Sequence, residues 1–485
     1  VNELRTKRAK AWEDAKNFLD SHRNENGILS EEDTKTYEEM EAKIVNLGKE
    51  IERQEKMDAM EREMAMPVNT PITSKPENTK MDEKKGRASD TYKKAFSVTN
   101  LETGEVLEES YDKLSLSPGA KPTQPRLPGV GLNKLCTLRT VEDTFRIKAY
   151  ISENHPKSAV LAGGGFISLE LAENLRELGM EVTIVQRPKQ LMNPFDPDMA
   201  AFIHSEMRRH GVKLALGHTV EGFEEKDGGV DVLLKDEAPL HADMVVLAIG
   251  VSPDTQLAQD AGLELGVKGS IVVNDRMETS VPDIYAVGDA VQVKHFVTGQ
   301  DVLLSLAGPA NKQGRIAADN ICGGDSHYTG SQGSSVIKVF DMTAATTGVN
   351  ETNAKKAGLD VDTVILSPMS HAGYYPGGKV MTMKVVFEKE TYRLLGAQIV
   401  GYEGVDKRID VLATAIRAGL KATELKDLDL AYAPPYSSAK DPVNMAGFMI
   451  ENIAKGVLKQ WHLTDADTLP RDGSVTLLDT RTVGE

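Results

Sequence analysis

The sequence predicts an α/β protein that is preceded by a helical arm, and two changes of pattern along the chain support this prediction. Residues 1–65 are dense in Glu, Lys, Arg and Met and contain no proline, which favours helices. From about residue 97 onward, short β-rich runs alternate with helical runs. Alternation of this kind is typical of a sheet covered by helices.

The bulk composition limits the class of protein. The 485 residues are 40% apolar, which is enough for several cores, and about 150 residues per domain suggests roughly three domains. The formal charge of -16 argues against a nucleic-acid partner or an anionic membrane surface, because such partners require clustered Lys and Arg. No run reaches the roughly 18 apolar residues of a membrane span. We therefore expect a cytoplasmic protein with no nucleic-acid or membrane partner.

The cysteine content excludes two further classes of site. With only Cys136 and Cys322, the chain has neither a disulfide framework nor a Cys-based zinc site, and a reducing compartment fits best. The sequence predicts no metal site.

The arm is expected to form two helices separated by "NENGILS". The apolar face of the first helix consists of Leu4, Trp12, Ala15, Phe18 and Leu19. The second helix should begin at Ser30, with Asp33 completing a capping box. Its apolar positions step by three and four residues and are Tyr37, Met40, Ile44, Leu47 and Ile51. This spacing indicates a coiled coil or a helical hairpin, which we interpret as a packing face. Residues 66–96, rich in Pro, Asn, Thr and Lys, are predicted to be a flexible linker.

The clearest βαβ unit spans residues 158–186. "SAVLA" is a strand, "GGG" a tight turn, "FISLELAENLRELG" a helix and "EVTIV" the returning strand. We expect Ile167, Leu171 and Leu175 to face inward from the helix. The later strands "DVLL" and "MVVLAIG" are expected to extend the same sheet. Ahead of this unit, "LETGE" looks like a hairpin turn and "KLSLSPGA" like a buried strand.

The turn in this unit has the spacing of a dinucleotide site. Gly163, Gly165 and Ser168 occupy the G-x-G-x-x-G frame between a strand and a helix. The first glycine permits the turn, and the second lets a pyrophosphate approach the positive N-terminus of the helix. An isolated glycine-rich turn is most often only a turn, but the complete βαβ unit favours a Rossmann-like nucleotide-binding domain.

The end of the second strand bears on the choice of cofactor. An acid here would hold the ribose 2′-hydroxyl of NADH, whereas this chain has Gln186 followed by Arg187. The guanidinium could pair with the 2′-phosphate of NADPH, which is slightly favoured over NADH, or Arg187 could be a solvated surface charge.

A second strand tip predicts half of a flavin site. "IYAVGDA" reads as a strand from Ile284 to Val287 that ends in Gly288 and Asp289. Open α/β sheets bind their ligands at such tips.

From about residue 97 to 458 the order of motifs resembles the pyridine nucleotide-disulfide oxidoreductases, specifically the coenzyme A-disulfide reductase branch. The matching motifs are "YDKLSLSPGAKP", "LAGGGFISLELAENL", "VVLAIGVSPDTQLA", "IYAVGDA", "LAGPANKQGRIAADNI", "HAGYYPGG" and "YAPPYSSAKDPVN". The resemblance implies an incomplete FAD-binding Rossmann-like domain, a complete NAD(P)-binding one and an α+β dimerisation domain. The expected boundaries are 97–150 and 268–329 for the FAD part, 151–267 for the NAD(P)H domain, 330–458 for dimerisation and 459–485 for a C-terminal stub.

The resemblance also implies roles for individual residues. Asp289 would hold the flavin's ribityl chain, Leu306 and Ala307 would contact the isoalloxazine, and Glu170 would point toward the nicotinamide. The remaining residues expected near a cofactor are Ser117, Pro118, Gly119, Ala120, Phe166, Ile167, Gly250 and Gly288. The tyrosines expected on the coenzyme A side, reaching a partner subunit's active site in a homodimer, are Tyr374, Tyr375, Tyr432 and Tyr436. The alternative for these tyrosines is ordinary packing at an interface.

The implied reaction passes a hydride from NAD(P)H to FAD and then reduces a small-molecule disulfide containing coenzyme A, through a cysteine thiolate. That cysteine and an N-terminal G-x-G-x-x-G belong before residue 97 in this family, where the arm and linker stand instead. Cys136 and Cys322 do not match the redox position and are interpreted as structural. We therefore expect impaired activity. The alternatives are an NADH oxidase or peroxidase of the same family, and a structural or assembly protein that merely binds nucleotide.

Two shorter resemblances concern the ends of the chain. "NENGILSEEDTKTYEEMEAKIVNLGKEIERQE", the linker and "ASDTYKKAF" resemble the start of a tailed-phage major capsid protein, which would make the chain a chimera. "HLTDADTLPRDGSVTLLDTRTVGE" resembles the first strand of a rhodanese domain, with Asp479 and Arg481 matching its D-x-R pattern.

Overall fold

A computed structural model describes most of the chain and divides it into two compact units. The described residues are 2–22, 30, 33–43, 45–48, 50, 97–99, 106–108, 110–462, 465, 468–476 and 478. The units are Val1–Gly86 and Arg87–Glu485, and each is described by itself. None of the described helices is both long enough and apolar enough to cross a bilayer.

The first unit contains the helices predicted for the arm. Helix α1 spans Asn2–His22, and a second helical stretch covers 33–43, 45–48 and 50. On α1, Ala15 is buried but Trp12 is 59% exposed, so the predicted apolar face is only partly correct. Ser30 caps the second stretch, because its Oγ accepts a hydrogen bond from the Asp33 amide at 3.1 Å. The side chains of Leu4 and Ile44, Ile51 and the linker lie outside the described residues.

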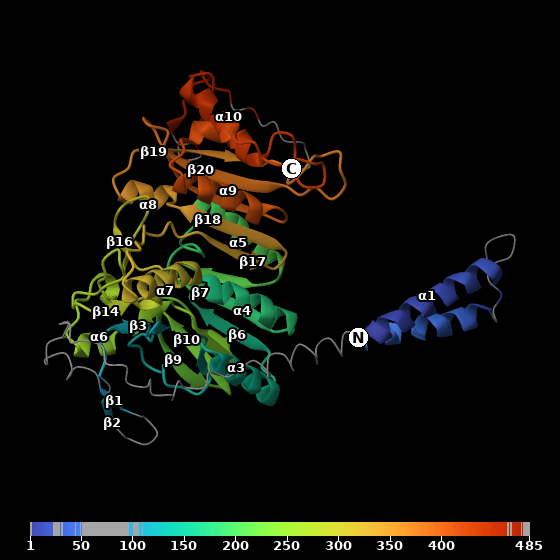
Figure 1. The fold of residues 1–485 in the computed structure, drawn as a ribbon, viewed down its shortest axis with the longest axis horizontal. Helices are drawn as coiled ribbons and strands as arrows, with labels where there is room; N and C mark the ends of the chain where they lie inside the picture. The colour runs from blue at the N-terminus through green and yellow to red at the C-terminus, as the bar shows by residue number, and fades with distance from the viewer. Residues whose placement is uncertain are drawn as a thin grey trace, which may run out of the picture. The chain divides into compact units, whose positions relative to one another are not determined.

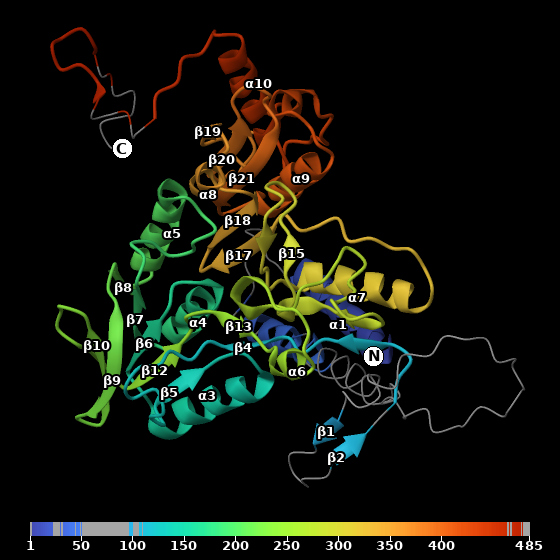
Figure 2. The same ribbon diagram turned by 90° about the vertical axis from the view of Figure 1, so that its left-hand side faces the viewer.

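A five-stranded parallel sheet forms the centre of the second unit, in the order β5-β12-β6-β7-β8. Figure 2 shows its strands beside helices α3, α4 and α5. The elements are β5 (Leu135–Thr137), α3 (Val141–Asn154), β6 (Ser158–Ala162), α4 (Phe166–Glu177), β7 (Glu181–Gln186), α5 (Pro197–Arg209), β8 (Lys213–Leu216) and β12 (Met244–Leu247).

Alternation along these strands divides the side chains between two cores. Leu161, Ile184 and Val246 pack in the core that contains buried side chains of all three helices. Val160 and Val245 point to the opposite face, where they meet a three-stranded antiparallel sheet. That sheet has the order β11-β10-β9 and consists of β9 (Val220–Lys226), β10 (Gly229–Leu234) and β11 (Leu240–Ala242).

Two expectations for this domain are corrected. "DVLL" lies in β10 and therefore belongs to the covering sheet rather than to the parallel one. The buried face of α4 is formed by Ser168, Leu169, Ala172 and Leu175, whereas Ile167 and Leu171 are only partly buried. The helix is rotated from the predicted setting because small side chains at Ser168 and Ala172 let it approach the sheet closely.

Chain segments before and after the parallel sheet in the sequence combine into a third region. β3 (Leu114–Leu116) pairs in parallel with β14 (Ile284–Ala286), and β4 (Ala120–Pro122) pairs antiparallel with β13 (Val251–Pro253). A hairpin of β1 (Ser97–Thr99) and β2 (Val106–Glu108) precedes them, although its turn lies outside the described residues. The other elements are α6 (Gln256–Asp260), η2 (Val267–Gly269), η3 (Gly288–Ala290), β15 (Val293–Lys294), β16 (Asp301–Val302) and α7 (Ala307–Ile321).

The C-terminal region is an α+β domain, as predicted. Its antiparallel sheet has the order β17-β18-β21-β20-β19, and Figure 1 shows α9 and α10 in orange and red beside it. The strands are β17 (Ser335–Val339), β18 (Met342–Gly348), β19 (Val361–Leu366), β20 (Met381–Glu388) and β21 (Leu394–Gly401). The helices are α8 (Glu351–Lys356), α9 (Val405–Arg417), η4 (Ala422–Asp427) and α10 (Pro442–Ala454).

This sheet also packs on both faces. Ile337, Val339 and Ala344 share a core with α4 and α5, while Val385 and Ile399 pack with α9 and α10. Beyond α10, Gln460 and His462 hydrogen-bond to β19. The proposed rhodanese residues Asp479 and Arg481 lie outside the described residues.

Candidate functional site

The glycine turn after β6 has the backbone geometry that a nucleotide cradle requires. Gly163 has φ +121°, and a Cβ placed on it would lie 2.2 Å from the Ala248 carbonyl oxygen. Gly165 is the N-cap of α4, and a Cβ there would meet open space. The first glycine is therefore required by the fold, whereas the second leaves room for an anion at the helix N-terminus.

A cavity of about 580 Å³ opens above this turn. Its lining joins the glycine turn to Gln186, Arg187, His218 and Gly250. Gln186 is the last residue of β7, and Arg187 follows it with an exposed side chain. Among the described residues that line this cavity there is no carboxylate. The absence of an acid makes this end of the cavity compatible with a phosphate group.

The first two turns of α4 contribute two polar residues with different surroundings. Ser168 is fully buried, and its Oγ has no hydrogen-bond partner among the described residues. Glu170 is exposed overall, but its carboxyl is partly shielded from water, and this partial burial raises its pKa. The neighbouring Glu173 carboxylate raises the pKa of Glu170 further. Phe166 and Ile167, both partly buried, begin the helix, and Phe166 lines the nucleotide cavity.

The predicted flavin segments come together because β3 and β14 are parallel and end at the same edge. Ser117 follows β3, and Gly288, with φ +83°, follows the end of β14. The Val287 amide donates to the Leu116 carbonyl at 3.0 Å, and Asp289 lies just beyond. The segment Ser117–Ala120 therefore begins beside the "VGDA" tip, at the edge where open α/β sheets bind their ligands.

Arg139 joins these segments and was not identified from the sequence. Its Nη2 forms an ion pair with the Asp289 carboxylate at 2.7 Å, and its Nε donates to the Ala120 carbonyl at 3.3 Å. The residue comes from the loop between β5 and α3, and a lone Arg in a loop gives no sequence signal. Asp289 is consequently held in place by a cation.

A second cavity, of about 640 Å³, adjoins the first through Phe166, Asn193 and Pro194. Leu306, the N-cap of α7, lines it from one side, and Asn350 of the C-terminal domain lines it from another. Ala307, the first residue of α7, is exposed next to Leu306. Leu306, which is predicted to contact the isoalloxazine, therefore lines the cavity that adjoins the glycine turn, and Ala307 follows it in the chain.

The four predicted tyrosines lie in the C-terminal domain. The hydroxyls of Tyr374 and Tyr432 are hydrogen-bonded at 2.7 Å, and this bond raises the pKa of Tyr432. Tyr375 packs edge-on against His371. Tyr432 and Tyr436 line a separate cavity of about 550 Å³ together with Lys407. Tyr432 and Tyr436 thus line a different cavity from the one above the glycine turn.

Arg408 holds in place the two segments that carry the tyrosines. Its guanidinium donates to the carbonyls of Ser370 and Tyr436 and forms a buried ion pair with Asp441 at 2.9 Å. Burial acts to raise the pKa of Asp441, but hydrogen bonds from Ser437 and Arg408 outweigh it and lower that pKa. The sequence signal for Arg408 was its position on the apolar face of "RIDVLATAIRAGL". An arginine on the buried face of an amphipathic helix rarely lacks a charged or polar partner.

Neither of the two cysteines has the surroundings of a reactive thiolate. Cys136 is buried in β5, and burial raises its pKa. Cys322 is exposed at the end of α7. Neither lines the cavities described above.

The residues present fit NAD(P)H more completely than FAD. The Gly163 turn, the open approach at Gly165 and the adjoining cavity suit a dinucleotide. The strand tip at Asp289 suits a flavin, but the residues before 97 contain only Gly27, Gly48 and Gly86, and none of these is in a G-x-G-x-x-G frame. The family's pyrophosphate cradle for FAD therefore has no counterpart in this sequence. When bound, the two cofactors supply hydride transfer.

Comparisons with known proteins identify the family of the chain. The family model for pyridine nucleotide-disulphide oxidoreductases matches residues 14–314, and the model of the family's dimerisation domain matches residues 334–442. The NAD(P)H sulfur oxidoreductase (CoA-dependent) of Pyrococcus abyssi is 37% identical over 355 residues, which cover 71% of this chain and 79% of the relative. The coenzyme A disulfide reductase of Staphylococcus aureus is 35% identical over 357 residues, or 73% of this chain and 80% of that protein.

The fold is similar to that of solved structures as well. The reduced CoADR-RHD of Bacillus anthracis is 48% identical, with a TM-score of 0.76 over 78% of this chain and 68% of that one. These matches cover the nucleotide-binding and dimerisation regions, and enzymes of the family use FAD and NAD(P)H. The chain therefore belongs to the pyridine nucleotide-disulphide oxidoreductase family and is an oxidoreductase of that family.

Proposed function

We propose that this chain is an FAD- and NAD(P)H-dependent disulfide reductase, most similar to reductases of coenzyme A disulfide or coenzyme A persulfide. The observation that supports this most directly is the Gly163–Gly165 turn, which opens into the cavity bounded by Gln186 and Arg187. The names of the relatives supply the substrate class. NADPH is slightly preferred because Gln186 stands where an acid would select NADH, and the guanidinium of Arg187 next to it can pair with a 2′-phosphate.

The residues proposed for each cofactor remain those predicted from the sequence. Asp289, held by Arg139, would orient the flavin end, with Leu306 and Ala307 beside it. Glu170 would lie toward the nicotinamide, where partial burial of its carboxyl raises its pKa.

We expect low turnover from this chain. Reduction of a mixed disulfide requires a thiolate next to the flavin, and burial raises the pKa of Cys136, which disfavours its thiolate. Nucleotide binding, in contrast, requires only the cavity of the parallel sheet.

The visible spectrum of the purified chain tests the proposal. A flavin absorbance band that bleaches on anaerobic addition of NADPH would support it and contradict a purely structural role. Colourless protein that still quenches NADPH fluorescence on binding would contradict a flavoenzyme and leave a nucleotide-binding protein.

The choice of electron acceptor is a separate question. Tyr374 and Tyr432, whose hydroxyls are hydrogen-bonded to each other, resemble the coenzyme A-side tyrosines of the family, and this resemblance favours coenzyme A disulfide over oxygen or peroxide. A form that carries an FAD-binding G-x-G-x-x-G segment and redox cysteine ahead of residue 97 should turn over coenzyme A disulfide faster than oxygen. The Tyr374→Phe and Tyr432→Phe variants should lower only the disulfide reaction; equal losses with oxygen would contradict the assignment.

We also propose a homodimer formed through residues 330–458. The match to the dimerisation-domain model supports it, and so does the exposure of Tyr374 and Tyr436, whose side chains are 76% and 72% exposed in the single chain. Light scattering after size exclusion should give twice the mass of one chain, and a monomer at micromolar concentration would contradict this proposal.

The capsid-like origin of residues 1–96 and the rhodanese-like start after residue 458 remain proposals. The helices and the cap at Ser30 support only a helical arm. DNA reads that span the codons for Phe96 and Ser97 would show that both parts belong to one gene, and reads that never span this join would contradict a single protein.

A further inference from the structure

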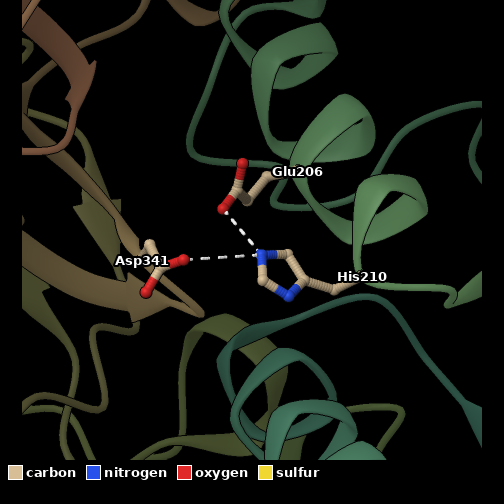
Figure 3. Close-up of side chains that lie close together, drawn as sticks. All are labelled: Glu206, His210 and Asp341. Carbon is tan, nitrogen blue, oxygen red and sulfur yellow. Dashed lines mark hydrogen bonds and ion pairs between the residues drawn. The ribbon is translucent and has the colours of Figure 1, made fainter.

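Three side chains of the kinds that bind metal ions lie close together where the nucleotide-binding domain contacts the C-terminal sheet. Glu206 lies in the last turn of α5, and His210 follows as the C-cap residue. Residues four apart on a helix share a face, so both side chains point the same way. Asp341 comes from the tight turn between β17 and β18, next to Phe340 with φ +52°. Figure 3 shows the His210 imidazole turned toward both carboxylates.

The distances among the three groups are those of a nearly formed coordination sphere. His210 Nε2 lies 3.2 Å from Glu206 Oε1 and 3.8 Å from Asp341 Oδ2. All three candidate ligand atoms lie within 4.8 Å of one another. Bonds of about 2.1 Å in a tetrahedral site place ligand atoms roughly 3.4 Å apart, so only the Asp341 carboxylate has to move inward.

Other contacts hold two of the ligands in position. The imidazole of His210 stacks on the Phe340 ring with centroids 4.1 Å apart. Glu206 is almost fully buried, and its Oε2 accepts a hydrogen bond from the Tyr402 hydroxyl at 2.8 Å. Support of this kind is characteristic of the groups that orient metal ligands. A cavity of about 270 Å³, lined in part by His210 and Asp341, provides access and space for water ligands.

One cation competes for the same oxygen. Arg209 Nη2 lies 2.8 Å from Glu206 Oε1, and its side chain is 56% exposed. The half-exposed guanidinium can turn into solvent when a divalent ion takes its place, because the ion then supplies the positive charge that the buried Glu206 carboxylate needs.

We propose that Glu206, His210 and Asp341 bind a divalent transition-metal ion of the zinc class, which links helix α5 to the β17–β18 turn. One imidazole nitrogen and two carboxylate oxygens suit Zn²⁺, Co²⁺ or Ni²⁺, whereas Ca²⁺ and Mg²⁺ prefer oxygen ligands only. The ion takes the position of the proton on Nε2, and water completes the coordination. This site is separate from the cofactor cavities and does not depend on the proposed reductase activity. The sequence signal for it was the E-x-x-x-H spacing of Glu206 and His210.

Zinc titration of the full chain against a chromogenic chelator tests the site, with the cobalt absorption spectrum as a second measurement. We expect His210→Ala and Asp341→Asn each to lower zinc affinity at least about tenfold. Arg209→Met should raise it, because the competing cation is gone. Far-UV circular dichroism checks that each variant is folded.

His241→Ala is the matched control, because His241 contacts a single carboxylate, that of Asp231. Its zinc affinity should equal that of the parent chain. Equal affinity in the parent chain and in His210→Ala or Asp341→Asn would overturn the three-ligand site. An unchanged affinity in Arg209→Met would overturn the assignment of Glu206 as a ligand.

Discussion

Ser168 stands where the dinucleotide frame has its third glycine, and it carries a fully buried hydroxyl without a partner among the described residues. Ser168→Ala should therefore raise the free energy of unfolding by about 1 kcal/mol, because it removes an unsatisfied buried polar group and favours the helix. Urea unfolding followed by circular dichroism measures the change.

Ser437→Ala is the matched control for this prediction. The Ser437 hydroxyl donates to Asp441 at 2.6 Å, so its removal should lower the free energy of unfolding by about 1–3 kcal/mol. If Ser168→Ala lost as much stability as Ser437→Ala, the Ser168 hydroxyl would have a partner and the prediction would be wrong.

Gln186 should decide between the two pyridine nucleotides. Gln186→Glu places a carboxylate at the end of β7, where it can bind ribose hydroxyls and repels a 2′-phosphate. We expect the ratio of NADPH to NADH affinity to fall by roughly tenfold or more, since one charged hydrogen bond contributes about 1.5–3 kcal/mol. Fluorescence titration with each nucleotide provides the ratio. Gln259→Glu, on the exposed side of α6, adds the same charge elsewhere and should leave the ratio unchanged.

At the scale of elements, one buried lysine joins β20, α5 and α8. Lys384 Nζ contacts Asp196 at 3.3 Å, Asp198 at 2.8 Å and Glu351 at 2.7 Å, and its side chain is 2% exposed. Burial acts to raise the pKa of Asp196, but the Lys384 ammonium and hydrogen bonds from Thr352 and Gln398 outweigh it and lower that pKa. Burial acts to lower the pKa of Lys384, but the three carboxylates raise it.

The signs of these shifts set the pH window of the cluster. A lowered carboxyl pKa contributes stability above the unfolded value of about 4, and that stability is lost as pH falls through the folded pKa. A raised lysine pKa contributes stability below the unfolded value of about 10.4, which is lost as pH rises through the folded pKa. The cluster should therefore stabilise the protein fully across the neutral range.

Lys384→Met tests this cluster, because it leaves Asp196 buried without its cation. The free energy of unfolding should fall by about 3–5 kcal/mol at neutral pH, and by less in acid, where a protonated Asp196 needs no partner. Urea titrations at several pH values measure both effects. Lys389→Met removes a lysine from an exposed pair with Asp360 and should change stability by no more than about 0.5 kcal/mol. A loss independent of pH would contradict the ionic explanation.

At the scale of the whole molecule, the first unit should be dispensable for nucleotide binding. Residues that form the glycine turn and its cavity all belong to the unit Arg87–Glu485. A chain that begins at Arg87 should bind NADPH with the same Kd as the full chain, measured by fluorescence. A large loss of affinity would show that the arm or linker contributes to the site.

The local sequence pattern predicted which helices and strands form better than it predicted which strands pair and which side chains meet. The strand β6, the glycine turn and α4 follow from period and glycine spacing, and the structure confirms them. "DVLL" has the pattern of any buried strand, so its place in the covering sheet could not be read from periodicity, which carries no information on pairing. Lys384 sits in "MTMKVVFE", and only tertiary contacts show that it is buried. For the same reason, Arg139 and Asp341 became visible as site residues only in three dimensions.

The pairing of β3 with β14 has a consequence for the order of folding. Leu114 and Ile284 are neighbours across the parallel ladder, although the entire nucleotide-binding domain lies between them in the chain. Closing so long a loop carries an entropic cost before any contact forms. Once the inserted domain has folded, however, Pro122 and Val251 are paired at its base, which holds the two ends together. We therefore expect the inserted domain to act as the template on which the two halves of the flavin region assemble last.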